Sequence, residues 1–184
     1  MRSFQSFARR IRVPMGFIFA AFFLWFARPT ISSLLWSLLL VLPGLALRGY
    51  ASAYIKKNAE LTRTGPYAYT RNPLYLGSIL IAFGFGVASN NWILIVALAL
   101  LFLLIYLPTI RSEEEFLRAT FPEFGVYAAR VPRLLPRILP AKFVDAAQGG
   151  FSGALYRKHR EYNAAMGAAA IYAALVVRWW ISVR

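Results

Sequence analysis

The apolar residues of this chain gather in long unbroken runs instead of alternating with polar residues. Five runs stand out, at residues 13–27, 31–50, 73–88, 92–110 and 163–181. About 20 apolar residues cross the hydrocarbon core as an α-helix, and a shorter run crosses when flanking charges reach the interface. The pattern therefore predicts an all-α fold: a polytopic membrane helix bundle with about five transmembrane helices.

Two polar segments interrupt the runs, at residues 51–72 and 111–162. We see no internal repeat, so we expect a single membrane domain over residues 1–184. Within it, residues 1–64 hold N-terminal helices and residues 65–140 hold a core of special residues. Residues 141–184 hold a surface helix and the last transmembrane helix.

Basic residues fix the expected orientation. Arginines precede the first run and basic residues crowd both polar segments, whereas the turn at residues 89–91 carries no charge. Lys and Arg accumulate on the cytoplasmic side of membrane proteins. We therefore expect a cytoplasmic N-terminus, with both polar segments on the cytoplasmic face.

Composition agrees with this class of protein. Hydrophobic residues make up 59% of the chain and the net charge is +14. No basic amphipathic or aromatic-interleaved module is present, so we expect membrane lipids and no nucleic acid as partners. The compact chain lacks long loops and a targeting extension, which favours an integral protein of a prokaryotic inner (cytoplasmic) membrane.

Several kinds of chemistry are excluded. The chain has no cysteine and a single histidine, His159. The absence of cysteine excludes thiol nucleophiles and zinc-thiolate sites. A single histidine makes a serine-histidine-aspartate triad or a site with several histidine ligands unfavourable, and we expect no metal. His159 is more typical of an interfacial position than of a catalytic one.

The segment GPYAYTRNPLYLG, residues 65–77, stands at the start of the third run. Asn72 suits a helix N-cap and Pro73 the first helical position, so both residues can be purely structural. Arg71 opposes the dipole of a helix N-terminus unless an anion lies there. The alternative partner for Arg71 is a lipid phosphate.

A second polar cluster follows the fourth run. Glu113, Glu114 and Glu115 are adjacent, and at most two of them can face one site on a helix. Carboxylates at an anionic membrane face need cationic or hydrogen-donating neighbours. A solvated helix start and a polar ligand site remain alternative interpretations.

Together, the two segments resemble the isoprenylcysteine carboxyl methyltransferase and phospholipid methyltransferase superfamily of integral membrane methyltransferases. The matching positions are Gly65, Tyr67, Arg71, Pro73, Tyr75 and Gly77, then Glu113, Glu114, Leu117, Phe121, Tyr127, Val131, Pro132 and Arg133. Two positions depart from the family pattern: Asn72 replaces a histidine and Pro122 replaces a glycine. Asn72 can still hydrogen-bond a ligand, but it cannot titrate.

The resemblance implies that the methyl donor is S-adenosylmethionine. It implies that the cofactor-binding residues are Arg71, Asn72, Tyr75, Gly77, Glu113 and Glu114, with Gly84 and Gly86 as a possible glycine motif. It also gives Arg111 and Glu114 as catalytic residues. Arg71 suits the carboxylate of the donor, and the two glutamates suit its ammonium or ribose diol.

We therefore expect a membrane methyltransferase that acts on a lipophilic acceptor at the cytoplasmic face. A thiolate or carboxylate acceptor needs no general base, whereas an amine must first lose a proton. The sequence leaves the acceptor open. The alternatives are an NADPH-dependent membrane reductase of the sterol reductase type and a non-catalytic scaffold.

Overall fold

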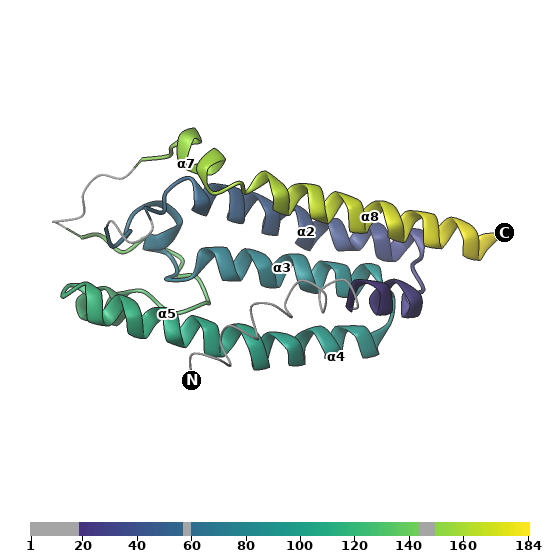
Figure 1. Ribbon diagram of the computed structural model, residues 1–184, viewed down its shortest axis with the longest axis horizontal. Helices are drawn as coiled ribbons and strands as arrows, with labels where there is room; N and C mark the ends of the chain where they lie inside the picture. Colours follow the sequence, from purple (N-terminus) through teal and green to yellow (C-terminus); the bar gives the residue numbers. More distant parts are fainter. Residues whose placement is uncertain (1–18, 57–59, 144–149) are drawn as a thin grey trace, which may run out of the picture.

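The computed structural model describes residues 19–56, 60–143 and 150–184 (Figure 1). These residues form helices and connecting turns without a strand, as the apolar runs predicted. Residues 19–26, the end of the first expected span, are helical. The rest of that span and the arginines before it lie outside the described residues.

Three helices are long and apolar enough to cross a membrane. They are α2 (Ile31–Ser52), the continuous helix Trp92–Thr120 and α8 (Tyr162–Val183). The third run forms α3 (Pro73–Ala88), which has only 16 residues. The all-helical membrane bundle is thus confirmed, with three of the expected spans at full length and α3 as a shorter apolar helix.

The helix that starts at Trp92 does not end at residue 110, and on this point the sequence-based boundary was wrong. It runs through α4 (Trp92–Leu101), a π-helical segment at Phe102–Tyr106 and α5 (Leu107–Thr120). Pro108 lies directly after the π-helical segment, and the helix continues past it. The three consecutive glutamates therefore lie on a continuation of a membrane helix.

The helices are arranged as a layered bundle, with α8 beside α2, α2 beside α3, and α4 and α5 along the other side of α3 (Figure 1). α2 and α3 approach each other closely at Gly44 and Gly77. A Cβ atom on Gly44 would lie 2.8 Å from the carbonyl oxygen of Gly77, and one on Gly77 would lie 2.8 Å from that of Gly44. Only glycine allows this approach, which brings the beginning of α3 against Arg48 on α2.

Short elements cover the end of the bundle at which α3 begins. They are a 3-10 turn (Gly65–Ala68), α6 (Phe124–Arg130) and α7 (Gly153–Lys158). Phe124, Tyr127 and Val131 form a small buried cluster there, against which Leu61 and Leu117 pack. This cluster joins the polar segment before α3 to the end of α5.

Replacing Gly44 with alanine should push α2 and α3 apart. We expect the Gly44→Ala variant to lose about 1–3 kcal/mol of stability, the usual cost of overpacking. Thermal unfolding of purified protein in detergent measures this loss. Gly167→Ala is the matched control, because a Cβ atom there meets nothing within 4 Å. Equal midpoints for the two variants would contradict the close crossing.

Candidate functional site

The site forms where α3 begins. Pro73 occupies the first helical position, as predicted, and Asn72 occupies the N-cap. The Asn72 side chain makes no capping bond, so the capping role predicted for it was wrong. Its amide instead donates to Oε1 of Glu114 at 3.1 Å and to the carbonyl oxygen of Arg133 at 3.0 Å. These two stronger partners turn the side chain away from the helix end.

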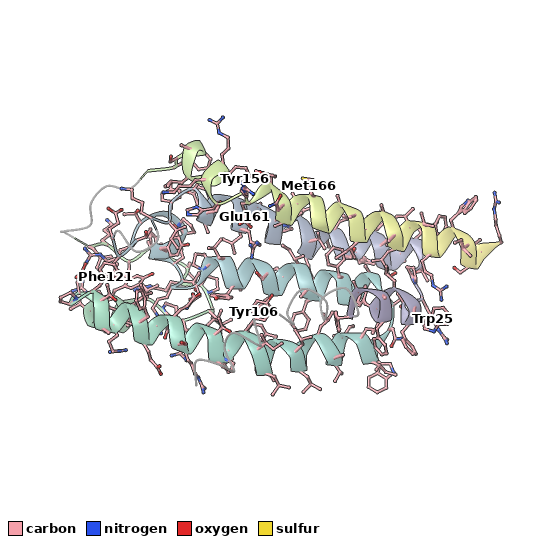
Figure 2. The ribbon with its side chains drawn as sticks, viewed as in Figure 1. Trp25, Tyr106, Phe121, Tyr156, Glu161 and Met166 are labelled. Carbon is pink, nitrogen blue, oxygen red and sulfur yellow. The ribbon has the colours of Figure 1, made fainter. Side chains whose placement is uncertain are left out.

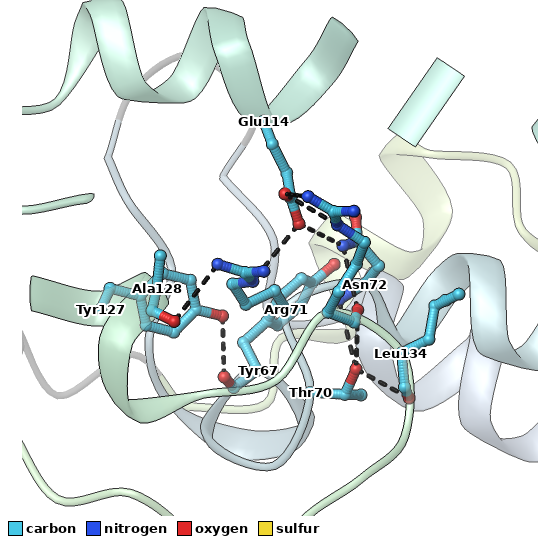
Figure 3. Close-up of polar contacts among 9 residues, drawn as sticks. Tyr67, Thr70, Arg71, Asn72, Glu114, Tyr127, Ala128 and Leu134 are labelled. Atoms are coloured by element: carbon cyan, nitrogen blue, oxygen red, sulfur yellow. Dashed lines mark hydrogen bonds and ion pairs between the residues drawn. The ribbon is translucent and has the colours of Figure 1, made fainter. Parts of the chain in front are cut away.

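Glu114 is the carboxylate on which this cluster converges (Figure 3). Glu114 is only 6% exposed, although it lies in a polar stretch of α5. Arg133 donates to Oε2 through Nε at 3.0 Å and Nη2 at 2.8 Å, and Nε of Arg71 lies 3.3 Å from Oε1. With the Asn72 amide, both carboxylate oxygens are therefore occupied by donors, as burial of a charge requires.

Arg71 lies at the N-terminus of α3, where an anion was expected, and in this structure Glu114 is that anion. The Arg71 amide donates to the carbonyl oxygen of Pro132 at 2.9 Å, and its Nη1 donates to that of Ala128 at 3.3 Å. Its guanidinium also lies 6.0 Å from the ring centroid of Phe124. Arg71 therefore ties the beginning of α3 to α5, α6 and the chain that follows α6.

Arg133 carries a role that sequence reasoning missed. The hydrogen bond from Arg133 to Glu114 raises the pKa of its guanidinium above the ordinary value. Its position in the Val131-Pro132-Arg133 motif was the available signal, since a proline keeps the residue before it extended, as Val131 is. Spacing alone could not show that its partner would be Glu114.

A cavity of about 430 Å³ lies beside this cluster. Its lining residues come from the two motif segments and from the end of α2: Arg48, Ile55, Lys56, Glu60, Leu61, Thr62, Tyr67, Arg71, Asn72, Pro73, Leu74, Tyr75, Glu113, Phe116, Leu117 and Tyr127. Charges of both signs face it. It therefore has the size and mixed polarity of a small-molecule site.

One buried polar atom of the cavity lacks a partner. Tyr67 is 6% exposed, and its hydroxyl makes no hydrogen bond within the described part of the chain. Tyr127, by contrast, donates its own hydroxyl to the Tyr67 carbonyl oxygen at 2.8 Å. Burial raises the pKa of Tyr67, so its hydroxyl stays protonated as a donor at neutral pH. An unpaired buried hydroxyl is costly and is readily explained by a bound partner.

Glu113 occupies a different position from Glu114. It is exposed toward the cavity, where its Oε1 accepts a hydrogen bond from the Tyr75 hydroxyl at 2.8 Å. The Tyr75 ring packs edge-on against Tyr106, the last residue of the π-helical segment, with centroids 5.8 Å apart. Glu113 therefore keeps one carboxylate oxygen available to a ligand, whereas both oxygens of Glu114 are engaged.

The structure thus brings Arg71, Asn72, Tyr75 and Glu113 to the cavity wall and places Glu114 behind Arg71 and Asn72. Arg111 is exposed on α5 and does not line the cavity.

The three predicted glycines lie on helix contacts away from the cavity wall. Gly77 faces α2, and a Cβ atom on Gly84 would lie 2.6 Å from Cγ2 of Val41. A Cβ atom on Gly86 would lie 3.1 Å from Cγ1 of Ile95 on α4. Gly84 follows Pro73 by 11 positions, which is about 16 Å along a helix. The contacts of all three glycines are those of helix packing.

A second cavity, of about 400 Å³, lies deeper among the helices. Its apolar lining includes Phe23, Phe85, Leu98 and Ile171, and its polar lining includes Ser78, Tyr106 and Asn163. Among the described residues, Arg48 is the charged side chain that lines both cavities. Arg48 therefore lies at the junction of a cavity of mixed polarity and a mainly apolar one.

Arg48 is held firmly at this junction. Its Nε donates to Glu161 at 2.5 Å, and its Nη1 donates to the Ser78 hydroxyl and to the Leu74 carbonyl oxygen. Figure 2 shows Glu161 where α7 leads into α8. The ion pair therefore fastens the beginning of α8 to α2 and α3 at the level of the junction.

No group of three or more histidine, aspartate or glutamate side chains is placed to hold a metal ion within residues 19–56, 60–143 and 150–184. His159, the single histidine, has its Nδ1 3.0 Å from the Ser52 carbonyl oxygen at the end of α2. It lies outside both cavity linings.

Two curated proteins are similar to half of the chain. The cobalt-zinc-cadmium resistance protein CzcN of Cupriavidus metallidurans is 40% identical over 93 residues, which are 50% of this chain and 43% of that protein. The nickel-cobalt-cadmium resistance protein NccN of Alcaligenes xylosoxydans xylosoxydans is 41% identical over 93 residues, 50% of this chain and 44% of that protein. The matches thus cover less than half the length of either relative. No solved structure matches the chain.

The family model described as phospholipid methyltransferase matches residues 44–123. This stretch begins at Gly44, the residue of α2 that packs against α3. It ends beyond α5, so it contains Glu113, Glu114 and the beginning of α3. The match confirms the resemblance seen in the two motifs. Residues 44–123 are therefore similar to the phospholipid methyltransferase family, which is part of the superfamily of integral membrane methyltransferases.

Proposed function

We propose that the protein is an integral membrane methyltransferase that transfers a methyl group from S-adenosylmethionine to a lipophilic acceptor at the membrane boundary. The observation that carries the proposal is the cavity of about 430 Å³ with the buried, unpartnered hydroxyl of Tyr67. Tyr67 and all but one of the residues that line the cavity lie in the segment that matches a methyltransferase family model. The match supports the reaction class, and the cavity offers a volume for the donor.

The residues present suit this donor. S-adenosylmethionine would supply a methyl group on a sulfonium, together with a carboxylate, an ammonium and a ribose diol. Arg71 and Lys56 offer positive charge to the carboxylate, and Glu113 and Glu60 offer negative charge to the cationic groups. The Tyr67 hydroxyl can donate to the ribose or the base. The cavity volume lies within the range of small-molecule sites.

The two adjacent glutamates, Glu113 and Glu114, have different roles in this proposal. Glu114 is a positioning residue, because its oxygens are occupied by Asn72, Arg71 and Arg133. Glu113 touches the donor, because it faces the cavity. Methyl transfer is an in-line displacement, so correct placement of the two reactants contributes much of the rate. Glu114 contributes by holding α3 and α5 in register around the cavity.

The deeper cavity is the proposed place of the lipophilic acceptor. Its lining is mainly aliphatic and aromatic, and it meets the donor cavity at Arg48. Ala164 and Gly167, small residues of α8, form part of its wall, and Gly167 is exposed. An apolar molecule could therefore approach from the bilayer while the donor enters through the polar side.

The first experiment is calorimetric titration of the purified protein with S-adenosylhomocysteine, the product form of the donor. We expect Glu113→Gln to weaken binding by about 1.5–3 kcal/mol and Tyr67→Phe by about 0.5–1.5 kcal/mol, the usual ranges for a charged and a neutral hydrogen bond. Glu115→Gln is the matched control, since Glu115 lies on the same helix but does not line the cavity.

The titration also separates the proposal from its alternatives. Binding of NADPH without competition from S-adenosylhomocysteine would replace the proposal with a membrane reductase of the sterol reductase type. Absence of any binding in the unsubstituted protein would favour a non-catalytic scaffold.

Glu114→Gln tests the positioning role. The change leaves the guanidinium groups of Arg71 and Arg133 without their counter-charge, and the Arg71 side chain is only 12% exposed. We expect a loss of about 3 kcal/mol of stability, the lower end for a broken buried ion pair because Arg133 reaches solvent. Thermal unfolding beside Glu115→Gln measures it. A midpoint equal to that of the control would show that Glu114 does not organise the fold.

Filling the deeper cavity tests the acceptor site. A Cβ atom at Gly167 meets nothing within 4 Å, so Gly167→Leu can place its side chain in the cavity without a backbone clash. We expect unchanged binding of S-adenosylhomocysteine but reduced transfer of labelled methyl groups into a membrane lipid extract. Ala169→Leu adds the same bulk at an exposed position outside the cavity. Equal methyl transfer by both variants would show that the acceptor does not bind in this cavity.

A further inference from the structure

The chain after α6 exposes an unusual amount of aliphatic surface. Residues 134–140, which we call the Leu-Pro segment, have the sequence LLPRILP. Leu135, Ile138 and Leu139 are 80%, 95% and 72% exposed. Isolated exposed apolar residues are common, but three within five positions form a patch that calls for a partner.

The Leu-Pro segment is held in place although it has no regular structure. The Arg137 amide donates to the Tyr69 carbonyl oxygen at 3.0 Å, and the Ala141 amide donates to that of Ala68 at 2.9 Å. The Thr70 hydroxyl lies 3.1 Å from the Leu134 carbonyl oxygen, which accepts from it. Backbone bonds thus fix the segment beside residues 68–70, with its aliphatic side chains pointing outward.

The length of α3 bears on the depth of the Leu-Pro segment in a membrane. The sixteen residues of α3 rise about 24 Å, less than the ~30 Å hydrocarbon core of a bilayer. An α3 that lies within the bilayer would therefore begin at or inside the boundary between hydrocarbon and head groups. Residues 68–70 immediately precede it, and the Leu-Pro segment is bonded to them. The exposed aliphatic patch would then lie at the depth of the membrane interface.

Basic residues predominate in the stretch of chain that contains the patch. Residues 124–143 contain four basic residues and no acidic one. Arg130, Arg137 and Lys142 are exposed, and they flank the aliphatic side chains. A surface that combines apolar side chains with surrounding Lys and Arg is typical of segments that bind anionic lipid head groups while inserting side chains among the acyl chains.

We propose that the Leu-Pro segment inserts Leu135, Ile138 and Leu139 into the membrane interface and binds anionic lipid through its basic neighbours. The inference does not rest on the proposed methyl transfer, because it concerns a surface outside both cavities. It does connect to the site, since Arg133, directly before the segment, holds Glu114. Lipid contact would steady the same stretch of chain that completes the carboxylate cluster.

The absence of cysteine from the chain makes a direct test possible. Ile138→Cys, labelled with an environment-sensitive fluorophore, is reconstituted as the full chain into two kinds of vesicle. One contains phosphatidylcholine alone, and the other contains equal parts of phosphatidylcholine and phosphatidylglycerol. Lipids with a nitroxide near the head of the acyl chain serve as quenchers. Ala119→Cys is the matched control, because it is exposed close to the end of the long helix Trp92–Thr120 and lies outside the Leu-Pro segment.

We expect blue-shifted emission and strong quenching at position 138, weak quenching at position 119, and deeper quenching at 138 in the anionic vesicles. Arg137→Gln in the Ile138→Cys background should reduce the difference between the two vesicles. Equal quenching at the two positions would overturn the proposal. Shielded emission at 138 without lipid quenching would also overturn it, because a protein partner or a second copy would then cover the patch.

Discussion

The structure around the site depends on one buried carboxylate. Glu114, in the middle of α5, accepts from donors on two other stretches of chain: the beginning of α3 and the segment after α6. A charge that is 6% exposed is tolerable only because these donors surround it. The requirement acts in both directions, since Arg71 and Arg133 would themselves lack a counter-charge without it. The cluster therefore fixes the relative position of elements that share few other contacts.

This constraint works together with the glycine crossing. Gly44 and Gly77 let α2 approach α3, which brings Arg48 and the end of α2 to the cavity. Glu114 holds α5 against the opposite side of α3. The cavity thus lies between two fixed contacts, one made by close backbone packing and one by ion pairing. Its walls come from segments far apart in sequence, which explains why its polar groups face one space.

Much of this could be predicted from the sequence. Long apolar runs have one stable form in a bilayer, so the helices were predictable, and so was the meeting of the two motif segments at one membrane boundary. The direction of the Asn72 side chain was not, because local capping preference was outweighed by partners 42 and 61 residues away. The roles of Arg133 and Tyr67 were equally hidden. Both depend on which atoms packing leaves nearby, and spacing along the chain does not carry that information.

The continuation of the fourth helix beyond residue 110 was missed for a related reason. Its last turns are polar, so the apolar pattern ended before the helix did. The extension has a physical consequence: one continuous helix carries both the apolar run that begins at Trp92 and the two glutamates Glu113 and Glu114. Successive residues on a helix point about 100° apart. Glu114 can therefore face the ion cluster while Glu113 faces the cavity, and one helix presents a structural carboxylate and a ligand-facing carboxylate from adjacent positions.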